Sequence, residues 1–218
     1  MTTQLSLYNK ALLLLGEEGL SALTDSVAKR RDLDTAWNDG ATDACLSQGQ
    51  WKFAMRTVQI DYDSSITPNF GYQYAFSKPA DFILVSALCS DDHFSSPVTA
   101  YDDDPGYWYA DLTPIYVRYV SNDASYGGDM SLWSQLFTDY VAAYLASQVV
   151  LKIAPQKASL FINPQNPLHT VPGRALLAAK SRDAMGGPEH GRAPGNWTRS
   201  RLQGGSSYDG GSISKLTG

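Results

Sequence analysis

The sequence has few cysteines, no long apolar run and few basic residues in its middle third. Its two cysteines, Cys45 and Cys89, lie far apart among 218 residues, so we expect two buried thiols and neither a disulfide nor a metal pair. The apolar run at residues 11–15 is too short to span a bilayer. We also expect no secretory leader, because no basic-then-apolar segment opens the chain. These features indicate a globular protein long enough to bury a core without cross-links.

The sequence also lacks the short motifs of common enzymes. It contains no HExxH, Walker, GxGxxG or GxSxG pattern, and its three histidines lie in predicted loops. The acidic triplet 102–104 is a candidate for cation binding, but it lacks the EF-hand pattern, and acidic surface turns are common. We therefore expect no enzyme, no cofactor and no metal site. The enzymatic alternative is a glycosidase-like carboxylate pair, at residues 17–18 or 91–92.

Charge is unevenly distributed along the chain. The net charge is −5, yet residues 57–130 hold 11 acidic and 2 basic side chains, whereas residues 172–218 hold 7 basic and 3 acidic ones. One interpretation is a solvated acidic surface and a loose basic tail. The other is that the two regions bind different partners. An acidic region of this kind repels nucleic acid.

Apolar residues recur at helical spacing in four segments, 3–15, 26–48, 131–153 and 173–185. In the second segment a kink or break is expected at Gly40, because glycine weakens a helix interior. A proline-rich crossing joins the third and fourth segments. From residue 57 the apolar period changes to two, which predicts short strands near 58–62, 72–76, 82–89, 98–101, 107–110 and 115–120. We expect the last two strands to form a hairpin around residues 111–114.

These patterns predict an α+β fold. Two N-terminal and two C-terminal helices would form a four-helix bundle, with a small antiparallel β domain inserted and an extended C-terminal arm. The predicted divisions are residues 1–56, 57–125, 126–185 and 186–218.

A cluster of apolar residues, Trp51, Phe53 and Met55, lies where the period changes. It fits either a short helix or a strand. In both cases the large aromatic side chains are expected to pack the helical part against the β part, because each can bury ~150–250 Å².

The segment 186–218 is rich in Gly, Ser and Pro and has little to bury. Within it lie Trp197, Arg199, Arg201 and Leu202, residue types that often anchor interfaces. We expect an arm that orders on binding another chain. An inert tail and a nucleic-acid contact are the alternatives.

Three stretches of the sequence resemble one known family. They are residues 7–25 (LYNKALLLLGEEGLSALTD), residues 51–56 (WKFAMR) after the helix end 43–46, and residues 72–85 (YQYAFSKPADFILV). In order and spacing these resemble the "N-A-L-x-x-L-G", "W-x-F-A-x-x-R" and "Y-x-x-P-x-D-x-L" motifs of the head-to-tail adaptors of short-tailed bacteriophages, the tail tubular protein A and tail accessory factor group. The resemblance covers roughly residues 5–88.

The resemblance implies a structural virion protein. Such adaptors form a ring, commonly of twelve subunits, beneath the portal; they close the head after DNA packaging and carry the tail nozzle and fibres. By that resemblance the helices would build the ring, residues 57–120 would face the tail, and Trp197, Arg199, Arg201 and Leu202 would lie in a portal-binding arm. DNA would pass through the lumen without sequence-specific binding, and the protein, assembled in the host cytoplasm, would not insert into a membrane.

Two rival functions stay open. One is a peptidoglycan or glycan hydrolase that uses acidic residues of the β block, an activity reported for some relatives. The other is a connector of a long-tailed phage, which uses the same helical core.

Overall fold

The structure of the chain, a computed structural model, describes residues 2–68 and 71–185. The described residues up to Ala184 form one compact unit. Within them are six α-helices and two small antiparallel sheets. The fold is therefore α+β, but the predicted four-helix bundle is wrong. The predicted arm at residues 186–218, with Trp197, Arg199, Arg201 and Leu202, lies outside the described residues.

The predicted second helix is in fact two helices. Helix α1 (Gln4–Leu15) is followed by α2 (Ala28–Asn38) and α3 (Ala41–Leu46). Gly40 separates α2 from α3 with φ of 88°. This left-handed conformation suits glycine and ends a helix. The N-terminal part thus has three helices of unequal length instead of two long ones.

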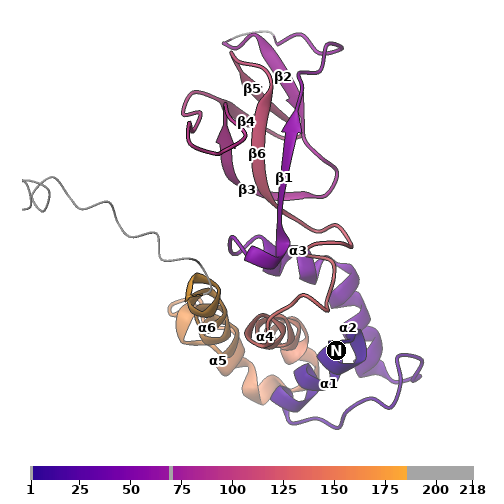
Figure 1. Cartoon of the computed structure of the whole chain (residues 1–218). Coiled ribbons are helices and arrows are strands. Elements are labelled where there is room, and N and C mark those ends of the chain that lie inside the picture. Colours follow the sequence, from indigo (N-terminus) through magenta and orange to yellow (C-terminus); the bar gives the residue numbers. More distant parts are fainter. Residues whose placement is uncertain (1, 69–70, 186–218) are drawn as a thin grey trace, which may run out of the picture. The chain divides into compact units, whose positions relative to one another are not determined.

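Helix α4 (Gln135–Ile153) is the centre of the helical part (Figure 1). It starts later than the sequence predicts, because the Ser134 hydroxyl accepts the Phe137 backbone N–H at 3.2 Å and caps it. α4 contacts α1, α2, α3 and the short α5 (Ala158–Phe161). Its length and apolar composition would also suit a membrane span, but more than half of it is buried inside the protein. One central helix surrounded by shorter ones replaces the expected bundle.

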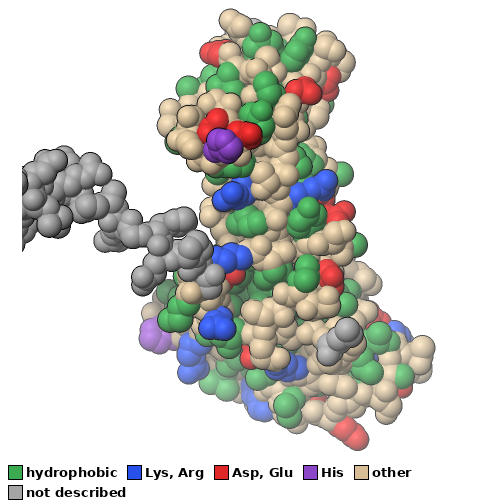
Figure 2. Space-filling model, in the orientation of Figure 1, with side chains coloured by type: hydrophobic (Ala, Val, Ile, Leu, Met, Phe, Trp, Pro, Cys, Tyr) green, Lys and Arg blue, Asp and Glu red, His purple; other side chains and the backbone are tan. Residues whose placement is uncertain are grey.

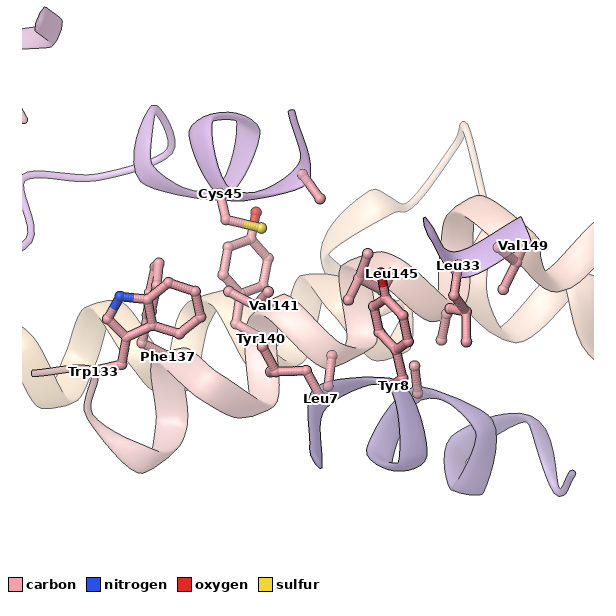
Figure 3. Close-up of a cluster of buried hydrophobic side chains, with 14 of the residues drawn as sticks. Leu7, Tyr8, Leu33, Cys45, Trp133, Phe137, Tyr140, Val141, Leu145 and Val149 are labelled. Atoms are coloured by element: carbon pink, nitrogen blue, oxygen red, sulfur yellow. The ribbon is translucent and has the colours of Figure 1, made fainter. Parts of the chain in front are cut away.

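Helix α6 (Val171–Met185) is the last described element. Figure 3 shows how the helical core is filled: α4 lies between α1 and α3, and side chains from both reach it. Leu7 and Tyr8 come from α1, Leu33 from α2 and Cys45 from α3, and all four are fully buried. Cys89 is also a buried free thiol, as the sequence predicts for both cysteines.

The strands form two three-stranded antiparallel sheets, β1-β6-β3 and β2-β5-β4. Figure 1 shows the strands grouped together, apart from the helices around α4. The bounds of the strands are β1 Met55–Ile60, β2 Tyr74–Ser77, β3 Phe82–Cys89, β4 Asp102–Asp104, β5 Tyr107–Ala110 and β6 Ile115–Ser121.

The predicted hairpin of β5 and β6 is wrong, because the two strands belong to different sheets. β5 pairs with β2 and β4, whereas β6 pairs with β1 and β3. Trp108 on β5 and Val117 and Tyr119 on β6 share one core. When two sheets face each other, the apolar side chains on their inner faces pack together and are buried.

The predicted strand at residues 98–101 is also misplaced. The observed strand is β4, an edge strand whose three aspartates are all exposed. Val98 instead donates its backbone N–H to the Leu88 oxygen at 2.9 Å. Apolar alternation did not identify β4, because backbone pairing at a sheet edge does not require apolar side chains.

The loop between β6 and α4 is held closely to the end of β6, and Gly127 makes this possible. A Cβ at Gly127 would lie 2.3 Å from the Ser121 oxygen and 2.9 Å from Leu46 Cδ1.

We expect Gly127→Ala to destabilise the fold by about 1–3 kcal/mol, because the backbone must move to make room for the added methyl group. Urea unfolding followed by circular dichroism measures this. Gly40→Ala is the control: its Cβ would meet nothing within 4 Å, so only the strain of positive φ, about 1 kcal/mol, is expected. Equal losses in the two variants would contradict the packing argument.

Candidate functional site

The helix–sheet junction is built around Trp51. A 3-10 turn (Lys52–Ala54) follows it, and β1 then begins at Met55. Trp51 is 2% exposed, and its ring centroid lies 4.8 Å from that of Phe137 on α4. Its indole N–H donates at 3.1 Å to the Leu46 oxygen at the end of α3, which also accepts the Gly49 backbone N–H at 3.3 Å. Trp51 therefore joins α3, α4 and the start of β1.

Phe53 and Met55 lie in the same cluster, both half-buried against the helical core. The Phe53 ring stacks beside Trp51 and lies 4.9 Å from the Phe137 ring. The predicted junction residues thus lie together. The segment is a 3-10 turn that leads into a strand, so neither a helix alone nor a strand alone describes it.

A second cluster, centred on Asp81, ties the sheet to the junction. Arg56 Nη1 donates to Asp81 Oδ2 at 2.9 Å, and the Tyr119 hydroxyl lies 3.2 Å from both carboxylate oxygens. The Ser121 hydroxyl also donates to Oδ2. Asp81 precedes β3, Arg56 lies on β1, and Tyr119 and Ser121 lie on β6, so one carboxylate links all three strands of a sheet. Sequence patterns did not reveal this cluster, because its members are 25–40 residues from Asp81.

Burial acts to raise the pKa of the Asp81 carboxyl, but the bonds from Ser121 and Arg56 outweigh it and leave the pKa below its usual value. Burial, and then the Asp81 charge, raise the pKa of Tyr119. The cluster is therefore an ionised carboxylate held by neutral and cationic donors. In the helical core, burial likewise raises the pKa of Cys45 and of Tyr140, so the Cys45 thiol stays protonated and unreactive.

The acidic residues singled out in the β part shape a loop, lie exposed or pair with a lysine. The carboxylate of Asp91 accepts the backbone N–H groups of Ser95 and Ser96 and shapes its own loop, whereas Asp92 is exposed. Asp103 forms an ion pair with Lys78. Within residues 2–68 and 71–185, no group of three or more His, Cys, Asp or Glu side chains suits a metal ion.

A groove with a volume of about 700 Å³ lies between α4 and the segment that leads into α6. Its walls are apolar or neutral and include no charged side chain; they include Tyr140, Tyr144, Leu151, Phe161, Ile162 and Leu168. Leu151 is 65% exposed and Leu168 53%. The sequence showed only a proline-rich crossing here, because the groove needs α5 and two 3-10 turns (Pro155–Lys157 and Pro167–His169) that carry no clear periodicity.

No family model matches the sequence, and no curated protein does either. The function must therefore be argued from the chain itself.

Proposed function

We propose that this protein is the head-to-tail adaptor of a short-tailed bacteriophage: a structural virion protein that forms a ring between the portal and the tail nozzle. The observation that carries the proposal is the pairing of Arg56 with Asp81 at 2.9 Å. Arg56 ends the WKFAMR stretch, and Asp81 is the aspartate of the KPAD stretch. Two of the three stretches that resemble the adaptor family thus meet in one interaction.

The third stretch also has a defined structural end. α1 stops at Gly16, which has φ of 75° and donates its backbone N–H to the Leu12 and Leu13 oxygens. Each of the three stretches therefore has a defined place in the fold. They supply the leucine-rich helix, the Trp51 junction and the Asp81 cluster. This supports the resemblance because motifs that merely coincide in composition need not interact.

The distribution of charge agrees with a protein that has different partners at its two ends. In the view of Figure 2 the upper β part shows acidic side chains, whereas the helical part shows Lys and Arg with acidic side chains among them. In the proposed role the helical part joins the subunits, residues 186–218 bind the portal, and the β part binds the nozzle and fibres. DNA passes through the lumen of the ring, which would number twelve subunits as the resemblance implies.

The test is the mass of the protein in solution, alone and with the portal of the same phage. We expect the full chain to form a stable ring with the portal, and a chain cut after Met185 to lose that complex, because the proposed portal-binding residues lie beyond the cut. A Trp197→Ala variant separates the loss of one anchor from the loss of the whole arm. A full chain that is indifferent to the portal would overturn the adaptor proposal.

A further inference from the structure

The outer face of the sheet β2-β5-β4 places tyrosine rings beside carboxylates. Along β5 the side chains alternate, so that Trp108 is buried in the β core whereas Tyr107 and Tyr109 are half-buried on the other face. The centroids of these two tyrosine rings lie 6.4 Å apart. On the edge strand β4, Asp104 lies directly opposite Tyr107, and Asp102 lies directly opposite Tyr109. Residues that pair in this way point to the same face of a sheet, so each ring has a carboxylate beside it.

A third carboxylate lies on the other side of Tyr107. Ser77 on β2 pairs with Tyr107, and its hydroxyl donates to Asp63 Oδ2 at 2.9 Å. The backbone N–H and the hydroxyl of Ser65 donate to Asp63 Oδ1 at 2.9 and 2.6 Å. The hydrogen bonds from Ser65 and Ser77 lower the pKa of Asp63, so this carboxyl is ionised at neutral pH. Acidic groups therefore lie next to Tyr107 on both neighbouring strands.

The inner face of the same two strands shows what such a combination binds. Asp103 on β4 lies directly opposite Trp108 on β5. The ammonium group of Lys78 forms an ion pair with Asp103, and its Nζ lies 5.3 Å from the centroid of the Trp108 ring. One pair of an aspartate and an aromatic residue across the strands thus holds a cation by charge and by cation–π attraction. The outer face repeats this pairing twice, with tyrosine in place of tryptophan.

Every Lys or Arg from β1 to β6 has a contact elsewhere. Arg56 donates to Asp81, and Lys78 lies at the inner face. The guanidinium of Arg118, on β6 of the other sheet, lies 4.6 Å from the centroid of the Phe94 ring. Neither aspartate of the outer pairs forms an ion pair with a residue that the structure describes. The two outer pairs are therefore open to a cation from another molecule.

We propose that the outer face of β2-β5-β4 binds a partner protein through an extended segment that carries Lys or Arg at alternate positions. Charge complementarity selects this occupant, because the face presents carboxylates beside aromatic rings. Alternate residues of an extended strand lie about 6.4–6.8 Å apart, which matches the 6.4 Å between the rings of Tyr107 and Tyr109. Two cations spaced in this way each lie over one ring and beside one carboxylate.

This inference refines the proposed function, in which the β part binds other tail proteins. It rests on that function only in assigning the basic segment to one of those proteins. The site itself is argued from the residues of the sheet and is tested with the protein alone.

The experiment titrates the full-length protein with a short peptide in which arginine alternates with threonine. Calorimetry measures the affinity, and NMR chemical shifts show which residues the peptide contacts. The arginine peptide should shift the signals of β4 and β5 and bind more weakly as salt rises, because exposed charges are screened. The same peptide with glutamine in place of arginine should not bind. A neutral oligosaccharide of N-acetylglucosamine tests the rival use of aromatic rings as a platform for sugars.

Three variants locate the binding. Asp104→Asn removes one carboxylate, and Tyr107→Leu removes one aromatic ring but keeps an apolar side chain. Each should weaken binding of the arginine peptide by about two- to fivefold, the range expected for an exposed ion pair or cation–π contact. Asp92→Asn is the control, because it changes the net charge as Asp104→Asn does, at an exposed aspartate in another loop. It should bind the peptide like wild type. Asp104→Asn changes an exposed side chain, so the test stands even if Tyr107→Leu fails to fold.

The outcomes separate the inference from its rivals and from the proposed function. Equal binding of the arginine and glutamine peptides would overturn the site, and so would folded site variants that bind the arginine peptide like wild type. Binding of the oligosaccharide but not of the arginine peptide would assign the face to a glycan and also overturn the inference. The mass of the full chain with the portal is a separate measurement. If the chain ignores the portal but binds the arginine peptide at this face, the proposed function fails and the site stands; the reverse result removes the site and leaves the adaptor role.

Discussion

Trp51→Ala should cost about 3–5 kcal/mol of unfolding free energy, because it removes a large aromatic from a closed core. The ring lies against Phe137 and Phe53, and its N–H donates to the Leu46 oxygen at the end of α3. Truncation therefore leaves a cavity and removes the indole hydrogen bond at the same time. Urea unfolding followed by circular dichroism, at concentrations where the protein is monomeric, measures the loss.

A second substitution separates the two causes. Trp51→Phe keeps an aromatic ring but removes the N–H, so we expect it to cost about 1–2 kcal/mol, in the range of an unmade buried hydrogen bond with some loss of packing. Leu13→Ala, at a position 74% exposed, is the control and should change stability by less than about 0.5 kcal/mol. A Trp51→Ala variant as stable as this control would show that the junction does not hold the helical part to β1.

Asp81→Ala should destabilise the protein by about 2–4 kcal/mol, because it leaves the Tyr119 and Ser121 hydroxyls and the Arg56 guanidinium without their shared acceptor. Asp81→Asn keeps the shape but removes the charge, so a smaller loss is expected. Asp102→Asn, on the exposed edge strand β4, is the matched control.

The same cluster predicts a dependence on pH. The pKa of Asp81 is lower in the folded protein than its usual value near 3.9. A carboxyl of this kind stabilises the fold above its unfolded pKa, and the contribution disappears as the pH falls through the folded value. Wild type should therefore lose stability on acidification below about pH 4 more steeply than Asp81→Asn. Parallel stability curves for the two proteins would show that Asp81 does not carry this part of the pH dependence.

The sequence predicts those helices, strands and breaks that depend only on neighbouring residues along the chain. Leu12 and Leu15 define α1 by their spacing, and the glycine at position 40 correctly suggested a break. β3 was also predicted at its observed bounds. In each case the pattern lies within one element, so no distant contact decides the outcome.

Features that depend on distant contacts were not predictable in this way. Nothing local to residues 107–121 says that Trp108 and Tyr119 face each other from two sheets, so the apparent turn between their strands suggested a hairpin. The Asp81 cluster and the groove likewise need side chains or elements that are far apart in sequence.

The acidic edge strand has a consequence for how copies of the chain can meet. β4 ends its sheet with Asp102, Asp103 and Asp104, all exposed. A second sheet approaching that edge to continue the ladder would bring its own aspartates against these, and like charges so close repel. The charged edge thereby disfavours fibre-like stacking of one β part on another at β4.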